Sequence, residues 1–207
     1  MKKYLGYSVA ILAVIFARLM PFSWIIGSTG FYFSWSTMIA PIVVKYIGMS
    51  WIGLFFIAKK GLTASVLLLH ILHRLPLVGA AYAYKTHHWF FSVVIPLICM
   101  GMFALHDVGC LAWPYTLYWL IPVVLWFGSD NLCSRALTSS FVAHAIGSVI
   151  WLYCGDTSAA TWMGLIPVVF VERLLMAMAI VGLDLLVAHC ALLYSNKVRS
   201  VKIASVV

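Results

Sequence analysis

Four ionisable residues lie in one long apolar stretch near the end of the chain, and their types could do chemistry. The stretch Leu165–Tyr194 carries Glu172, Arg173, Asp184 and His189 among residues that are otherwise almost all hydrophobic. It is long enough to cross a bilayer. Because an ionisable group in hydrocarbon is costly unless it is paired or hydrated, such residues point to a binding site or a pathway.

Glu172 and Arg173 are adjacent, so on a helix their side chains point about 100° apart and should not pair with each other. One interpretation is a polar site that opens outward, where Arg173 binds an anionic group and Glu172 binds a donor or a cation. The alternative is pairing between helices or snorkelling to the interface. Asp184 follows Arg173 by about three turns and should share its face, whereas His189 should lie near the interface.

A second group of polar residues falls on one helical face within the apolar segment Ala136–Tyr153. The group comprises Ser140, His144, Gly147, Ser148 and Trp151, and its spacing of i, i+4, i+7, i+8 and i+11 is that of one helix face. Such a stripe can line a cavity that binds a substrate. It can also let two helices pack closely with hydroxyl groups bridging them. Both interpretations stay open at this point.

The stretch Ala143–Gly147 resembles the AHxxG pattern of intramembrane rhomboid proteases. The GxSG motif that carries the nucleophile of those proteases does not occur in this sequence. Without that serine a Ser–His dyad has no support. We therefore expect no enzymatic activity of this kind.

Two further polar features lie in other segments. His70 and His73 are three residues apart, a spacing that can chelate a metal, but a site would need a third ligand, so we predict no metal and no other cofactor. Lys45 interrupts another apolar segment. Its side chain either snorkels to the surface or forms a buried pair with Asp184 or Glu172.

The composition identifies the class of protein that must position these residues. The chain has 207 residues, of which 65% are hydrophobic and 9% charged, whereas soluble domains are about 45–50% apolar and about 25% charged. We predict one integral membrane domain over residues 1–207, an all-α transmembrane bundle in contact with the lipid bilayer of the cell membrane. The formal charge of +8 does not indicate nucleic-acid binding, because the basic residues are scattered over span ends and short loops.

The expected spans are apolar segments separated by turn-like breaks. Seven can be drawn: Tyr4–Met20, Ser34–Ala58, Leu62–Tyr84, Trp89–Leu105, Leu111–Phe127, Ala136–Tyr153 and Leu165–Tyr194. The breaks are His106–Gly109, Gly128–Asn131 and Gly155–Ser158. The first segment follows two lysines like a signal peptide, but no small-x-small cleavage site follows, so we expect a retained span.

The distribution of charge favours six crossings with both termini in the cytoplasm. If Leu62–Tyr84 does not cross, the basic residues of the loops and of both ends fall on the cytoplasmic side, and the turns with Asp107 and Asp156 fall outside. The alternatives are seven crossings, another non-crossing segment, or a last stretch made of two half-spans. With six crossings, the last helix runs inward from a first turn at Pro167. Glu172 and Arg173 then lie one to two turns from the outer surface.

Three short stretches share their pattern with a known family. They are Ala17-Arg18-Leu19-Met20-Pro21-Phe22, the loop Gly27-Ser28-Thr29-Gly30, and Leu165-Ile166-Pro167 followed by Glu172. With about six spans and cytoplasmic ends, the chain resembles the substrate-binding S components of energy-coupling factor (ECF) vitamin transporters. Ala80-Ala81-Tyr82-Ala83 is the nearest stretch to their alanine-rich coupling motif, and the segment Leu62–Tyr84 departs from the family layout. The resemblance implies a small vitamin-like substrate, an ATPase module and a coupling membrane subunit.

Three functions are therefore weighed. The first is a transport component that binds and imports a small polar molecule through Glu172, Arg173, His144, Asp184, Lys45, Ser140, Ser148 and Trp151. The second is a non-catalytic membrane scaffold or assembly protein. The third is an intramembrane enzyme that depends on histidine or on a metal.

Overall fold

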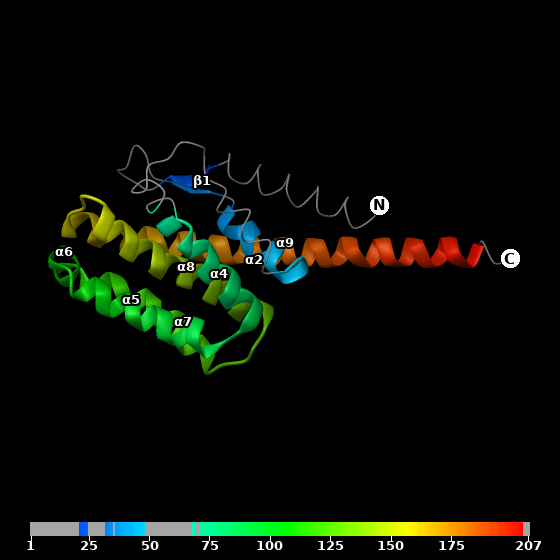
Figure 1. The fold of residues 1–207 in the computed structure, drawn as a ribbon, viewed down its shortest axis with the longest axis horizontal. Coiled ribbons are helices and arrows are strands. Elements are labelled where there is room, and N and C mark those ends of the chain that lie inside the picture. The colour runs from blue at the N-terminus through cyan, green and yellow to red at the C-terminus, as the bar shows by residue number, and fades with distance from the viewer. Residues whose placement is uncertain (1–20, 25–31, 35, 49–67, 69–70, 205–207) are drawn as a thin grey trace.

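The structure is mostly helical, which confirms the predicted helical class (Figure 1). This computed structural model describes residues 21–24, 32–34, 36–48, 68 and 71–204, and the side chains of residues 37–48, 68 and 71–196. A short antiparallel pair, β1 (Pro21–Trp24) and β2 (Tyr32–Ser34), precedes the helices. The predicted first span and the part of the second span after residue 48 lie outside the described residues.

From α4 onward the helical elements follow one another along the chain with short connections. In order they are α2 (Ser36–Tyr46), α4 (Leu75–Thr86), the π-helical turn η2 (Phe90–Val94), α5 (Ile95–Ala104), α6 (Asp107–Leu111), the 3-10 helix η3 (Trp113–Trp119), α7 (Leu120–Trp126), α8 (Leu132–Cys154) and α9 (Ala159–Ala204). The helix α8 is the hub of the bundle, because α4, α5, α7 and α9 all pack against it (Figure 1).

Small residues let α4 approach α8 closely. A Cβ atom on Gly79 of α4 would collide with the Ile146 side chain of α8, and the Ser139 hydroxyl donates a hydrogen bond of 2.9 Å to the Ala80 carbonyl. Close backbone approach with bridging hydroxyls is how helices associate where water does not drive their packing. On this side α8 therefore packs through Ser139, a residue beside the predicted polar stripe and not part of it.

The predicted segment Leu111–Phe127 is not one continuous helix. It is built from the end of α6, from η3 and from α7. Pro114 lies in the first turn of η3, and a proline disfavours α-helical geometry in the residue before it. Two aromatic side chains of η3, Tyr115 and Trp119, contact His144 of α8.

The turns at Gly128–Asn131 and Gly155–Ser158 are confirmed as connections between α7, α8 and α9. The turn predicted at His106–Gly109 is instead the start of α6, where the His106 ring accepts a hydrogen bond of 3.2 Å from the Val108 backbone N–H. At the start of α8, Asn131 and Ser134 form a capping box. Such caps satisfy backbone N–H groups that a helix leaves open.

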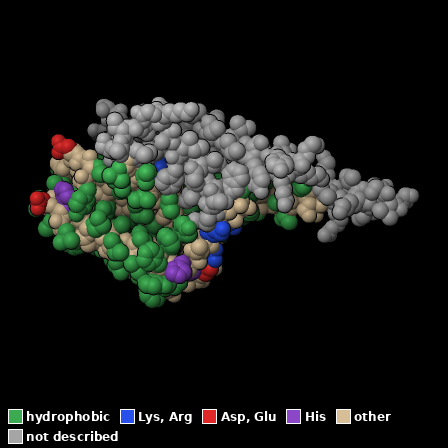
Figure 2. Space-filling model, in the orientation of Figure 1, with side chains coloured by type: hydrophobic (Ala, Val, Ile, Leu, Met, Phe, Trp, Pro, Cys, Tyr) green, Lys and Arg blue, Asp and Glu red, His purple; other side chains and the backbone are tan. Residues whose placement is uncertain are grey.

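The two ends of the bundle carry opposite charge. Asp107 and Asp156 lie at one end, which we call the acidic end. At the other, basic end, Arg135 donates two hydrogen bonds to Asp130, of 2.5 and 2.6 Å, and one of 3.3 Å to the Lys85 carbonyl. The hydrogen bonds from Arg135 lower the pKa of Asp130 below its ordinary value. Figure 2 shows acidic side chains at one extremity, and Lys and Arg side chains together with an acidic one toward the other.

The last helix is longer than its apolar segment predicted. It begins six residues before Leu165, so Pro167 lies inside the helix and not in its first turn. Its 46 residues correspond to about 69 Å at 1.5 Å per residue, and it extends well past the bundle (Figure 1). Two of the described helices, α8 and α9 over Ala159–Asn196, are long and apolar enough to cross a membrane.

The contact between α6 and α5 generates a test of this fold. A Cβ atom on Gly109 would overlap the Phe103 backbone carbonyl, whereas one on Gly101 would meet nothing. We expect Gly109→Ala to destabilise the protein by about 1–3 kcal/mol, because backbone cannot yield as a side-chain tip does. Gly101→Ala is the matched control and should leave thermal stability in detergent unchanged. Equal melting temperatures for the two variants would contradict the packing of α6.

Candidate functional site

His144 lies halfway along α8 with both ring nitrogens engaged. The Trp119 indole N–H donates to His144 Nδ1 at 3.0 Å, and the Tyr115 hydroxyl lies 2.7 Å from His144 Nε2. All three side chains are almost completely buried. Tyr115 and Trp119 belong to η3, so this network joins the broken segment to the hub helix.

Ser148 extends the network along α8 by one turn. Its Oγ lies 3.3 Å from the Tyr115 hydroxyl oxygen. That oxygen therefore lies between His144 and Ser148 in the network. Sequence reasoning predicted His144 and Ser148 on one face but missed Tyr115. Its signal was weak, because a tyrosine beside tryptophans in an apolar segment is typical of an interfacial belt.

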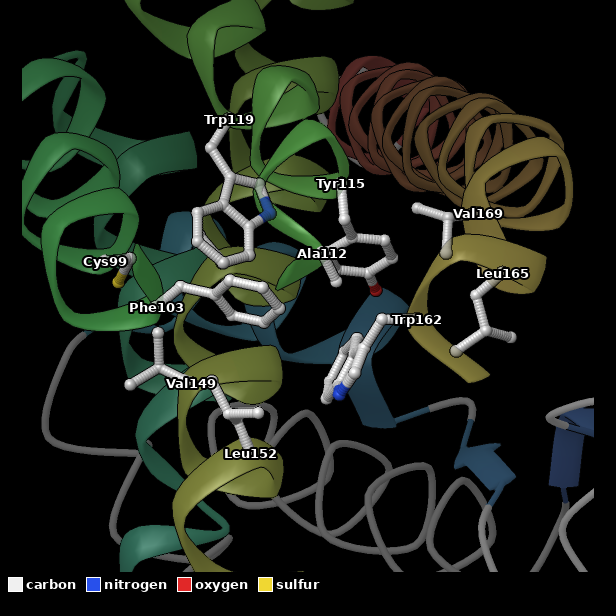
Figure 3. Close-up of a cluster of buried hydrophobic side chains, with 11 residues drawn as sticks. Cys99, Phe103, Ala112, Tyr115, Trp119, Val149, Leu152, Trp162, Leu165 and Val169 are labelled. Atoms are coloured by element: carbon white, nitrogen blue, oxygen red, sulfur yellow. The ribbon is translucent and has the colours of Figure 1, made fainter. Parts of the chain in front are cut away.

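Aromatic rings pack around the network on the side of the acidic end. The Trp162 ring of α9 meets the rings of Phe103, Tyr115 and Trp151 at centroid distances of 5.1, 4.9 and 4.9 Å. Figure 3 shows Phe103, Tyr115, Trp119 and Trp162 turned toward one another between the helices. Trp151, a predicted substrate contact, therefore lies against Trp162.

Arg173 is completely buried and lies 3.5 Å, Nη2 to Oε2, from Glu172. The expectation that these two neighbours cannot pair is wrong, because the long guanidinium side chain reaches back to the adjacent carboxylate. Ser140 accounts for part of the packing here, since its hydroxyl donates to the Arg173 backbone carbonyl at 3.0 Å. Ser140 thus joins α8 to α9 at this level.

The depth of Arg173 also differs from the prediction. Arg173 follows the start of α9 at Ala159 by fourteen residues, which is about 21 Å along the helix. It therefore lies about four turns from the start of α9, whereas a first turn at Pro167 would have placed it one to two turns in. The difference arises because α9 begins earlier than its apolar segment does.

The structure brings two of the predicted groups together. Ser140, one turn before His144 on α8, donates to the Arg173 backbone carbonyl at 3.0 Å, so Arg173 and Glu172 of α9 lie beside the network around His144. We call the side chains of Tyr115, His144, Ser148, Glu172 and Arg173 the central polar site. It combines a cation, a carboxylate, an imidazole and two hydroxyls in an apolar surrounding, where electrostatic interactions are strong.

Lys45 and Asp184 form a separate centre. Lys45 Nζ lies 2.6 Å from Asp184 Oδ2, so Lys45 pairs with Asp184, one of the two partners that the sequence left open, while its own side chain stays partly exposed. The Tyr46 hydroxyl lies 3.5 Å from the Asp184 backbone carbonyl, and the Lys45 amine lies 5.6 Å from the centre of the Tyr84 ring. Asp184 follows Arg173 by eleven residues, about 16 Å along α9. We call Lys45 and Asp184 the basic-end pair.

The histidines proposed as metal ligands do not form a centre that the structure describes. His73 is exposed, and His70 lies outside the described residues. Among the described residues, no group of three or more His, Cys, Asp or Glu side chains is placed to hold a metal ion. His189, which was expected near the interface, is exposed on α9.

No protein-family model matches this chain, and neither a curated protein nor a solved structure is significantly similar to it. We therefore infer its function from the residues of the two polar centres and their placement in the bundle.

The basic-end pair makes an asymmetric prediction about stability. The Asp184 side chain is 4% exposed and the Lys45 side chain 37%. Lys45→Met strands a buried carboxylate and should cost about 2–4 kcal/mol. Asp184→Asn should cost less, because the lysine that remains can reach solvent.

The double variant Lys45→Met/Asp184→Asn completes the cycle. It should be close in thermal stability to Asp184→Asn alone, since no buried charge is left without its partner. Melting temperatures of the four proteins in one detergent measure these differences. Additive losses in the double variant would show that the pair does not hold α2 on α9.

Proposed function

We propose that this chain is a multi-pass protein of the cell membrane that binds a small polar, vitamin-like molecule and imports it. The observation that carries the proposal is the central polar site, where Arg173 of α9 is completely buried near the middle of α8, and both of these helices are long and apolar enough to cross a membrane. Ionisable residues at such a depth are characteristic of substrate and ion pathways. Substrate sites of transporters commonly lie near the bilayer midplane.

The proposal gives a role to the two charged residues of the central polar site and to four residues outside it. Arg173 binds an anionic group of the substrate, and Glu172 binds a donor or cationic group beside it. Ser140 and Trp151 support the site from behind, because Ser140 bonds the Arg173 carbonyl and Trp151 packs on Trp162. Lys45 and Asp184 hold α2 against α9 and do not contact the substrate.

The charge distribution of the bundle supports six crossings with cytoplasmic termini. Lys85 and Arg135 lie at the same end, joined by the hydrogen bond from Arg135 to the Lys85 carbonyl. Asp107 and Asp156 lie at the opposite end. If the basic end faces the cytoplasm, the arrangement follows the positive-inside rule. The first turn of α4 lies beside the middle part of α8, because Pro76 lies near Gly147. This placement agrees with a re-entrant course for Leu62–Tyr84.

The resemblance to ECF substrate-binding components suggests the partners. In this proposal an ATPase module and a coupling membrane subunit drive uptake, since the chain has no nucleotide-binding motif of its own. The stretch Ala80–Ala83 does not serve as the docking motif, because Ala80, Ala81 and Ala83 are buried inside the bundle. The surface that meets the coupling subunit must lie elsewhere.

A membrane scaffold is the second candidate, and the contact between α4 and α8 favours it. Ser139 bonds the Ala80 carbonyl, and the basic-end pair joins α2 to α9, so several polar groups serve helix association. The third candidate, a histidine-dependent enzyme, has no comparable support. The Trp119 indole N–H donates to His144 Nδ1 and so occupies the lone pair of that nitrogen. A general base needs a free lone pair to accept a proton.

The transport proposal predicts that the charges of the central polar site hold the ligand. Protein purified in mild detergent should release a small polar molecule that mass spectrometry detects. Arg173→Gln and Glu172→Gln should each retain at least about tenfold less of it, because losing one contact with a buried charge costs about 2–5 kcal/mol. Uptake of the identified molecule by cells should fall in parallel, at unchanged protein level.

His189→Gln is the matched control, since His189 is an exposed ionisable residue of the same helix. It should retain the molecule as the wild type does. Full retention by both Arg173→Gln and Glu172→Gln would refute the site. Full cellular function of those variants, with a stable complex containing another membrane protein, would favour the scaffold.

The orientation is tested with single cysteines in a cysteine-free background. Asp156→Cys places a thiol in the loop at the acidic end, and Gly128→Cys places one at the basic end, where a Cβ meets ordinary contacts. A membrane-impermeant maleimide should label Asp156→Cys in intact cells and Gly128→Cys only after permeabilisation. The reverse pattern would invert the proposed topology.

A further inference from the structure

The hydrogen bonds at His144 fix where its proton lies. An indole N–H can only donate, so His144 Nδ1, which lies 3.0 Å from Trp119 Nε1, must accept. A histidine that accepts at Nδ1 carries its proton on Nε2 and is neutral, because both nitrogens of the charged form are donors. His144 Nε2 therefore donates to the Tyr115 oxygen at 2.7 Å.

The same reasoning fixes the direction of the Tyr115 hydroxyl. Its oxygen accepts from His144, so its own proton must go to another acceptor. The acceptor within reach in the network is Ser148 Oγ at 3.3 Å. That distance is long for a bond between two hydroxyls, which is commonly about 2.7–2.8 Å. The Tyr115 O–H therefore points toward Ser148 Oγ, but the hydrogen bond between them is weak.

We infer that Trp119 and His144 are positioning residues that aim the Tyr115 hydroxyl proton at the ligand, so that Tyr115 and Arg173 together select an anionic group, a carboxylate or a phosphate. This inference rests on the proposed function. Tyr115 supplies a neutral donor and Arg173 a charged one, and both meet the same face of α8, where Ser140 bonds the Arg173 carbonyl and His144, one turn further on, meets Tyr115. An anion accepts from both, whereas a neutral amide of the same shape gains less from the guanidinium.

His144 has a different role here from the one its type suggests. As a direct ligand it would use a nitrogen that is now bonded to Trp119 or to Tyr115. It acts instead by keeping the Tyr115 oxygen occupied as an acceptor. A ligand that presents a donor to Tyr115 would compete with His144 for that oxygen, so the network disfavours cations at this position.

The first arm of the test needs no ligand. Full-length protein labelled with 15N-histidine and held in lipid nanodiscs should show a His144 signal of the neutral form with its proton on Nε2, and the signal should not titrate between about pH 5 and 8. His144→Gln assigns the signal by its loss. Trp119→Phe removes the donor and should let His144 change tautomer or titrate. A wild-type His144 that carries its proton on Nδ1, or titrates in this range, overturns the inference.

The second arm follows the His144 Nε2–H signal while benzoate, inorganic phosphate or benzamide is added. An anion that accepts the hydrogen bond of the Tyr115 hydroxyl polarises that hydroxyl. Benzoate or phosphate should therefore shift the His144 Nε2–H signal saturably, and benzamide should not. The anion that acts distinguishes a carboxylate from a phosphate ligand. Tyr115→Phe and Arg173→Gln should abolish the shift, and an unchanged response in Tyr115→Phe, or none in the wild type, overturns the inference.

Ser148→Ala keeps the test decisive if Tyr115→Phe does not fold. It removes the competing acceptor, so the same shift should occur at a severalfold lower anion concentration, and an unchanged or weaker response would contradict the direction of the proton. The outcomes also separate the two proposals. A correct tautomer and anion response without cellular uptake would leave the inference standing and reject the transport function. Cellular uptake by a protein whose His144 carries its proton on Nδ1 would reject the inference and leave the transport function standing.

Discussion

The structure depends on one constraint, which is that polar groups in an apolar bundle must find their partners inside the protein. The hydrogen bonds around His144 satisfy this constraint where the chain is least regular. The 3-10 helix η3 supplies Trp119 and Tyr115 to the two ring nitrogens, and the tyrosine passes the chain of bonds on to Ser148. A break in a membrane segment is tolerated where it is buried in protein. Here the break also determines which side chains reach the middle of the bundle.

The hub helix α8 serves packing and chemistry from different positions around its axis. Ser139 bonds the carbonyl of Ala80 on α4, and Ser140, the next residue, bonds the carbonyl of Arg173 on α9. His144 and Ser148, one and two turns further on, meet Tyr115. Packing and site formation were alternatives for one stripe of residues in the sequence. In the structure Ser140 packs α8 on α9, and His144 and Ser148 form hydrogen bonds with Tyr115, because neighbouring residues of a helix point to different partners.

Regular spacing made much of this arrangement predictable. The i, i+4 and i+8 positions of Ser140, His144 and Ser148 identify one buried face of α8, since every α-helix has this geometry. The location of Tyr115 was not predictable, because the sequence predicts one continuous apolar segment over Leu111–Phe127, whereas Tyr115 lies in a 3-10 helix, whose 3.0 residues per turn place side chains differently from an α-helix. The depth of Arg173 was misjudged because an apolar segment marks what is hydrophobic and not where a helix begins. The pair of Lys45 and Asp184 spans 139 positions in the sequence, and only tertiary packing selects it from the other possible partners.

The two ion pairs of α9 differ in what they do for the fold, and this difference bears on function. Lys45 and Asp184 come from separate helices, so their attraction holds α2 against α9 and offsets the cost of burying Asp184. The contact between Glu172 and Arg173 lies within a single helix, so that contact joins no second element. Burying a guanidinium completely is costly even when it is paired. The proposed recognition of a charged molecule would use such charges at mid-depth. The proposal therefore places the ligand at the central polar site and not at the basic-end pair.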